Sequence, residues 1–168
     1  SIRDIIQNNL IKIDISTYDF LLNISKNDNR KILIFPGTTF YETKRTSLEK
    51  EISLYNEYFK FVAKKIEFNT ILFKPHPGSY KEKLRLISER TNLISPINNA
   101  KSIYQDISNL PLEIVVDLLL KSNKNLKIYL PICSSGSFST CMIFANNIYP
   151  LKAFGRKLIK KYIYQNYV

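Results

Sequence analysis

The amino-acid sequence predicts an α/β fold with a Rossmann-like, doubly wound parallel sheet. Short, nearly continuous apolar runs such as KILIF and TILF are typical of strands buried on both faces. Between these runs, apolar residues recur every three or four positions, as they do on an amphipathic helix. Strands that alternate with helices indicate βαβ units, in which helices connect parallel strands.

The first half of the chain carries the clearest signals. The run KILIFPG (31–37) predicts a strand that ends at a Pro-Gly turn. Residues 47–68 place apolar side chains at helical spacing, which predicts a helix with one buried face. The segment 70–74 then repeats the strand pattern, and 79–91 repeats the helical pattern.

The second half continues the alternation. A weak strand is expected over 92–95, followed by a helix over 112–121 that is entered through Pro111. The apolar run at 127–132 predicts another strand, and 135–146 a further helix.

The length of 168 residues fits one domain or two small ones. We expect an N-terminal helix or linker over 1–30, because 25–30 (SKNDNR) is entirely polar, and a Rossmann-like domain over 31–150. Residues 151–168 mix Lys and Arg with Leu, Ile and Tyr. This pattern predicts a basic helix that either packs on the domain or lies on an anionic membrane surface.

The composition indicates which classes of binding partner to expect. Twenty-five Lys and Arg against 14 Asp and Glu give a formal charge of +11, which favours an anionic partner. No Arg/Gly-rich or ribonucleoprotein motif points to nucleic acid, and no apolar run is long enough to span a bilayer. Cys133 and Cys141 lack the spacing of a zinc site or a disulfide framework, so we interpret them as small buried residues.

Three predicted strands end in residues suited to binding an anion. Gly37 and Thr38 follow the first, the KPHP run (74–77) follows the second, and Ser134 and Ser135 follow the strand over 127–132. Ligands of such folds bind outside the carboxyl ends of the strands. A glycine beside small hydroxyl residues, and a helix that begins at Ser135, are features of a phosphate site.

His76, the only histidine, lies between Pro75 and Pro77 in this pattern. The prolines restrict the backbone, so the imidazole is held at a strand end, where it can contact a phosphate together with Lys74. The alternative is a histidine that only caps a turn. Likewise, the two serines also fit ordinary helix capping.

Glu113 lies in the first turn of the helix entered through Pro111. A carboxylate there compensates the helix dipole, and it is also suited to accept hydrogen bonds from the two hydroxyls of a ribose.

The ordered set of Lys74-Pro75-His76-Pro77, Pro111-x-Glu113 and Ser134-Ser135 resembles the donor-binding half of bacterial two-domain GT-B sialyltransferases, the group of the lipooligosaccharide sialyltransferases and capsular polysialyltransferases. The segment ILIFPGTTFYE is similar to the one that opens their nucleotide domain. The match covers roughly residues 31–146.

The resemblance implies transfer of sialic acid from CMP-sialic acid to a cell-surface glycan such as lipooligosaccharide or capsule. His76 would contact the CMP phosphate and assist its departure, Ser134 and Ser135 would hold that phosphate, Glu113 would bind the ribose and Lys74 would add positive charge. No metal and no other cofactor is implied. The expected location is the bacterial cytoplasm, with peripheral contact at an anionic inner membrane.

The general base of this family is a carboxylate in an acidic motif that the sequence lacks. Glu42 is the best local substitute. The simplest hypothesis is that the chain is the C-terminal half of the enzyme, with the acceptor domain elsewhere; an exposed cleft edge on such a fragment leaves a homodimer open.

Two other functions remain open from the sequence. One is a GT-B transferase that uses CDP-glycerol or another nucleotide-sugar, since CDP-glycerol polymerases carry a similar KPHP motif. The other is a basic nucleotide-binding or assembly module without chemistry.

Overall fold

The computed structural model describes residues 15–26, 31–89, 101–103 and 107–163. Its centre is a parallel sheet in which β1 (Lys31–Pro36), β2 (Thr70–Lys74), β4 (Lys127–Ile132) and β5 (Ile148–Lys152) lie in the order β2-β1-β4-β5. The three-residue β3 (Lys101–Ile103) extends the sheet beyond β2. Every pair of neighbouring strands is parallel. The predicted Rossmann-like parallel α/β sheet is thereby confirmed.

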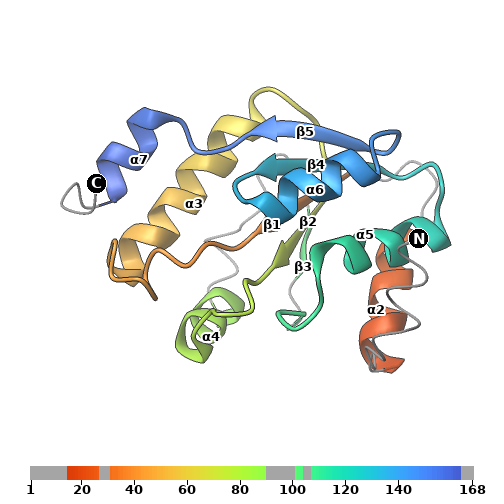
Figure 1. The fold of residues 1–168 in the computed structure, drawn as a ribbon, viewed down its shortest axis with the longest axis horizontal. Coiled ribbons are helices and arrows are strands. Elements are labelled where there is room, and N and C mark those ends of the chain that lie inside the picture. The colour runs from red at the N-terminus through yellow and green to blue at the C-terminus, as the bar shows by residue number, and fades with distance from the viewer. Residues whose placement is uncertain (1–14, 27–30, 90–100, 104–106, 164–168) are drawn as a thin grey trace.

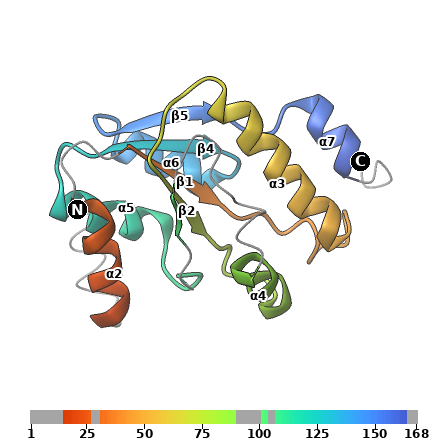
Figure 2. The ribbon, with the colours of Figure 1, turned by 180° about the vertical axis from the view of Figure 1, so that it is seen from behind.

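Helices cover both faces of the sheet (Figures 1 and 2). They are α2 (Ile15–Ser25), α3 (Leu48–Ala63), α4 (Lys81–Glu89), α5 (Leu112–Ser122), α6 (Ser135–Ile143) and α7 (Arg156–Tyr162). The buried hydrophobic side chains form two clusters, which we call the first and the second core. The first core contains residues of α2 and α5, and the second contains residues of α3 and α4.

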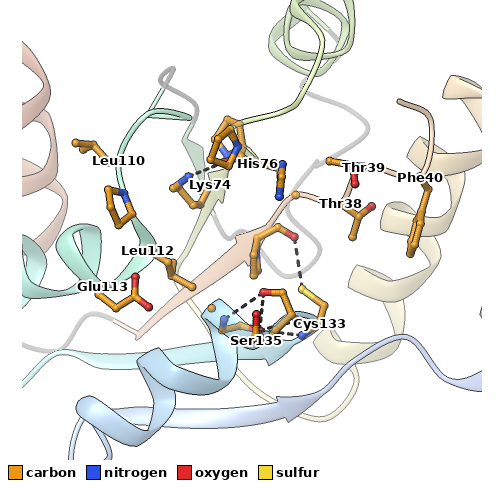
Figure 3. A pocket seen from close by; sticks show the side chains of 18 residues that line it. Thr38, Thr39, Phe40, Lys74, His76, Leu110, Leu112, Glu113, Cys133 and Ser135 are labelled. Carbon is orange, nitrogen blue, oxygen red and sulfur yellow. Dashed lines mark hydrogen bonds between the residues drawn. The ribbon is translucent and has the colours of Figure 1, made fainter. Parts of the chain in front are cut away.

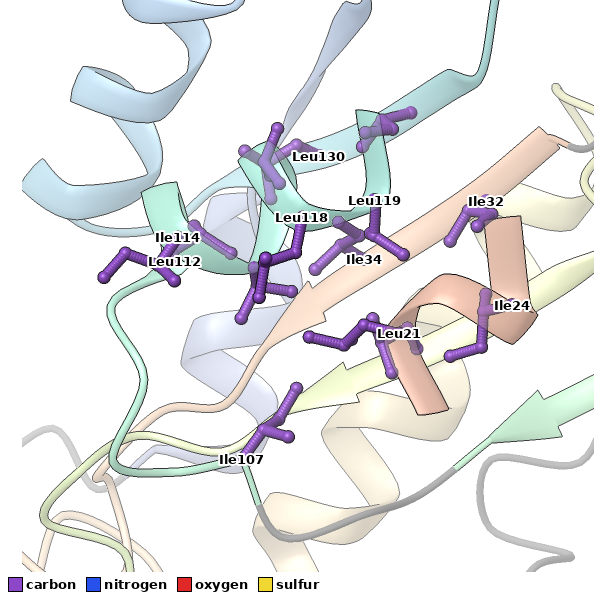
Figure 4. Packing of buried hydrophobic residues seen from close by; sticks show 14 of the residues in the cluster. Leu21, Ile24, Ile32, Ile34, Ile107, Leu112, Ile114, Leu118, Leu119 and Leu130 are labelled. Atoms are coloured by element: carbon purple, nitrogen blue, oxygen red, sulfur yellow. The ribbon is translucent and has the colours of Figure 1, made fainter. Parts of the chain in front are cut away.

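The alternation of side chains along β1 explains these two cores. Ile32 and Ile34 face the core that contains α2 and α5, whereas Leu33 and Phe35 face α3 and α4. All four are fully buried, which is why the sequence shows an unbroken apolar run instead of a polar–apolar alternation. Figure 4 shows Ile34 beside Leu119 of α5, and Ile32 farther along β1, near the end of α2.

The helix α2 belongs to the domain, contrary to the expectation that the domain begins after residue 30. Its Leu21 and Ile24 are buried in the first core, and Ser122 Oγ of α5 donates a hydrogen bond to the backbone oxygen of Leu22. The polar run at 25–30 indicated a boundary, but the helix before it packs back against α5.

The carboxyl-terminal region also differs from the prediction. The strand β5 was not predicted, and the expected boundary at residue 150 falls inside it. The basic helix begins at Arg156, after β5, and not at the expected residue 151. It packs against α3, which is one of the two placements that the sequence left open. The predicted strand over 92–95 lies outside the described residues.

The order of the strands reverses between β1 and β4. The chain moves outward from β1 to β2 and β3, and then returns to place β4 on the other side of β1. In open α/β sheets, the crevice at such a reversal is where ligands bind. The loops after β1, β2 and β4 therefore meet at this edge. Among the described residues, no helix has the length and apolar character to cross a membrane.

The position of α2 leads to a stability prediction. Replacing the fully buried Leu21 by Ala should lower the free energy of unfolding by about 2–5 kcal/mol, because it leaves a cavity between α2 and α5. Urea unfolding followed by circular dichroism measures this loss. The control is Leu22→Ala, the same change at a half-buried neighbour, which should have a smaller effect. If both variants lose the same small amount of unfolding free energy, α2 does not contribute to the core.

Candidate functional site

A cavity of about 390 Å³ opens at the carboxyl-terminal edge of the sheet. The loops after β1, β2 and β4 and the first turn of α5 form its walls. Figure 3 shows His76 on one wall and Ser135 with Cys133 on the opposite wall; Glu113 lies toward α5 and Thr38 toward α3. The predicted residues Gly37, Thr38, Lys74, His76, Glu113, Ser134 and Ser135 all line this cavity.

Gly37 allows the loops after β1 and β2 to approach each other. Its backbone N–H donates to the backbone oxygen of Lys74 over 2.8 Å. A Cβ atom at this position would lie 3.0 Å from Cζ of Phe73 and 3.3 Å from the backbone nitrogen of His76. A larger residue would therefore push the two strand ends apart.

The next residue, Thr38, is fixed by α3. Its backbone N–H donates to the hydroxyl of Tyr55 over 3.0 Å, and its own hydroxyl donates to Oε1 of Glu51 over 2.6 Å. The hydroxyl of Tyr55 also donates to this carboxylate, over 2.6 Å. Burial, and then the charge of Glu51, raise the pKa of Tyr55 well above its usual value, so the phenol keeps its proton.

Beneath Thr38, the ammonium group of Lys83 pairs with two carboxylates. Its Nζ lies 2.6 Å from Oε1 of Glu51 and 3.1 Å from Oε2 of Glu42, and it also donates to the backbone oxygen of Thr38. The side chains of Lys83 and Glu51 have no exposed surface. We call Thr38, Glu42, Glu51, Tyr55 and Lys83 the buried polar network.

Glu42, the candidate base from the sequence, belongs to this network and does not line the cavity. Its Oε1 accepts the backbone N–H of Tyr80 over 3.1 Å, while Oε2 binds Lys83. Both oxygens are engaged and the side chain is 6% exposed. In this structure Glu42 therefore acts as a structural anchor for the loop after β1.

The imidazole of His76 is exposed and held in one orientation. Its Nδ1 accepts the backbone N–H of Gly78 over 2.9 Å. Because Nδ1 is used as an acceptor, Nε2 is the ring nitrogen left to carry a proton. The Nε2–H group is then a hydrogen-bond donor for a ligand.

Lys74 is buried beside His76 and contacts backbone oxygens. Its Nζ donates to the backbone oxygens of Pro75 over 2.6 Å and Ser108 over 3.2 Å. The side chain thus joins the loop after β2 to the segment that precedes α5. It places a positive charge behind His76.

The start of α6 forms the opposite wall. Ser134 caps the helix by accepting the N–H of Ser137, and the buried Ser137 hydroxyl accepts the N–H groups of Cys133 and Ser134. Within the described part of the chain, no acceptor binds the N–H groups of Ser135 and Gly136. These two donors, at the positive end of the helix dipole, are suited to an anion.

Glu113 lies in the first turn of α5. Its Oε1 accepts the hydroxyl of Ser139 over 2.8 Å, and no partner of its Oε2 is found among the described residues. Leu110, Pro111 and Leu112 also line the cavity at this end and give it an apolar wall. Oε2 of Glu113 can accept hydrogen bonds from the hydroxyl groups of a sugar ring. The apolar wall beside it can pack against a flat heterocycle attached to that ring.

Sequence reasoning identified the strand ends but missed Glu51 and Lys83. Glu51 is next to Ile52 and four residues before Tyr55, so it lies at the edge of the predicted buried face of α3. This position was the one available signal for Glu51. No cluster of His, Cys, Asp and Glu suited to a metal ion occurs in the parts of the chain that the structure describes.

No family model, curated protein or solved structure matches this chain. The geometry of the cavity must therefore be interpreted from its own residues.

Cys133 provides a probe of the cavity, since it lines the wall and is a free thiol. Burial raises its pKa to about 11. In a Cys141→Ala variant, alkylation by iodoacetamide should thus accelerate about tenfold per pH unit between pH 8 and 10, because the thiolate fraction still rises there. A ligand in the cavity should slow the reaction. A rate that levels off near pH 9 would contradict the raised pKa.

Proposed function

We propose that this chain is the donor-binding half of a GT-B sialyltransferase, which transfers sialic acid from CMP-sialic acid to a cell-surface glycan such as lipooligosaccharide or capsule. One observation carries the proposal. Four segments that are distant in sequence, each with the residue type expected from the resemblance, line one cavity at the reversal of the sheet. Such a crevice is the usual place for a nucleotide in this type of sheet.

The phosphate of the donor would lie between His76 and the start of α6. On one side it would accept the Nε2–H of His76, and on the other the N–H groups of Ser135 and Gly136. When the bond from the sugar carbon to the phosphate oxygen breaks, negative charge grows on the departing CMP. Donors already oriented toward that position stabilise this charge without rearranging.

The nucleoside would occupy the end of the cavity at α5. Oε2 of Glu113 would accept the ribose hydroxyls, while Ser139 holds the other carboxylate oxygen in place. The apolar wall of Leu110, Pro111 and Leu112 would then lie beside the pyrimidine. The sugar would extend from the phosphate toward Thr38 and Thr39.

The acceptor base is assigned to another domain. Among the described residues that line the cavity, Glu113 is the one carboxylate, and the proposal uses it for the ribose. Glu42 is engaged with Lys83 and the N–H of Tyr80. A separate acceptor domain that supplies the base fits both observations and the two-domain architecture of GT-B enzymes.

Calorimetric titration with CMP, CMP-sialic acid and CDP-glycerol tests the proposal. His76→Ala should weaken CMP binding by about 10- to 150-fold, the effect of losing one hydrogen bond to a charged group. Lys81→Ala, an exposed change outside the cavity, is the control. Preference for CDP-glycerol would favour the polymerase alternative. Unchanged CMP affinity of His76→Ala would favour a binding module without chemistry.

The role of Glu113 is tested with 2′-deoxy-CMP. The unaltered protein should bind CMP about tenfold or more tightly than 2′-deoxy-CMP, because the carboxylate accepts the ribose hydroxyl. Glu113→Gln should narrow this difference, since it removes the charge. Asp117→Asn is the matched control one turn along α5, where Asp117 pairs with Lys121 outside the cavity. An unchanged preference in Glu113→Gln would rule out the assigned contact.

A further inference from the structure

A second concave surface lies between α3, β5 and α7. It consists of two adjoining hollows, of about 750 and 210 Å³, which share Tyr58, Phe61 and Lys152. Neither hollow has a residue in common with the candidate site. We call this surface the basic groove; the residues that characterise it are Phe61, Lys65, Lys152, Lys157, Leu158 and Lys160.

The charge of the basic groove is almost entirely positive. Five lysines and one carboxylate, Glu57, line the two hollows. That carboxylate is already occupied, because Lys161 Nζ lies 2.7 Å from it and the Tyr162 hydroxyl donates to it. Both contacts lower the pKa of Glu57, so it stays ionised. In the described part of the chain, no carboxylate pairs with Lys152, Lys157 or Lys160.

The same surface exposes apolar groups between the lysines. The ring of Phe61 is 48% exposed, although it lies on a helix whose opposite face is well buried. The ammonium of Lys65 lies 4.2 Å from the centre of that ring, and Leu158 is half-buried across the groove. An exposed aromatic ring flanked by lysines combines apolar insertion with charge attraction.

The groove is held in shape by contacts between α7 and the domain. The Tyr58 hydroxyl donates to the backbone oxygen of Lys152 over 3.0 Å. The backbone oxygen of Tyr162 accepts the hydroxyl of Thr46, and Phe154 packs its ring 5.1 Å from that of Tyr58. The lysines of α7 are therefore presented by a docked helix.

We propose that the basic groove binds the surface of a membrane that contains anionic lipids. The lysines would contact the phosphate headgroups, while Phe61 would enter the boundary between headgroups and acyl chains. The exposed ring of Phe61 beside lysines favours a membrane over an acidic protein. A ring at that position can enter the apolar layer beneath the headgroups that the lysines contact.

This inference is independent of the donor proposed for the cavity. It has a spatial consequence, however. Lys152 ends β5 and all strands are parallel, so the part of the groove at Lys152 lies at the same edge of the sheet as the cavity. From there the groove extends along α3 to Phe61 and Lys65. Membrane contact would hold that edge near the bilayer.

Vesicle co-sedimentation of the full chain tests the proposal. We expect binding to phosphatidylcholine vesicles that contain about 30% phosphatidylglycerol, loss of binding as salt is raised, and little binding to pure phosphatidylcholine. Lys157→Ala/Lys160→Ala should weaken the binding at least about tenfold. The matched control is Lys124→Ala/Lys127→Ala, two exposed lysines at the amino end of β4. Equal losses in both pairs, or no preference for anionic vesicles, would overturn the proposal.

Insertion of Phe61 has its own readout, because the chain contains no tryptophan. In Phe61→Trp, the fluorescence should shift to shorter wavelength on adding anionic vesicles and should be quenched by lipids brominated in their acyl chains. Phe138→Trp places the probe at another exposed position, on α6, and should show neither effect. The same spectra for both variants would show that Phe61 does not enter the bilayer. The groove would then bind its partner by electrostatic contacts alone, or bind a protein.

Discussion

The buried ammonium group of Lys83 is the interaction on which the geometry of the candidate site depends. It connects α4 to Glu51 of α3 and to Glu42 and the backbone oxygen of Thr38 after β1. Removing three charged groups from water is costly, and such pairs often contribute little net stability. Each carboxylate accepts further hydrogen bonds, from Tyr55, from the N–H of Tyr41 and from the N–H of Tyr80. What the buried polar network provides is one defined arrangement, because any other would leave a charge unpaired.

That arrangement determines what the cavity presents to a ligand. The buried polar network fixes Thr38, Lys74 fixes the loop that carries His76, and the Ser134–Ser137 capping pair fixes the start of α6. Three walls are therefore oriented before any ligand arrives. A preorganised site loses less conformational entropy on binding, and its donors need not move as charge develops.

The sequence predicted the elements whose signals are local. Continuous apolar runs gave β1, β2 and β4, and helical spacing gave α3, α5 and α6, with ends that shifted by a few residues. The strand β5 was not predicted, because it is a largely exposed edge strand that contains Pro150. Such a strand shows neither a continuous apolar run nor a regular alternation of apolar and polar residues. Likewise, a glutamate on α3 and a lysine on α4 normally face solvent. Only the tertiary fold places Glu51 and Lys83 side by side.

The distribution of charge sets the two concave surfaces apart. The net charge of +11 suggests a strongly cationic site, yet the cavity presents mainly N–H donors, from Nε2 of His76 and from the backbone at the start of α6. The ammonium of Lys74 is buried against backbone oxygens, so its charge acts from behind the wall. In the basic groove, lysines line the surface directly. In the transfer proposed for the cavity, the phosphate must leave after each turnover, which oriented N–H donors serve better than exposed cations do. Prolonged attachment to an anionic surface requires several cations at once. The excess of lysine therefore fits the attachment proposed for the groove, and the donors of the cavity fit the proposed transfer.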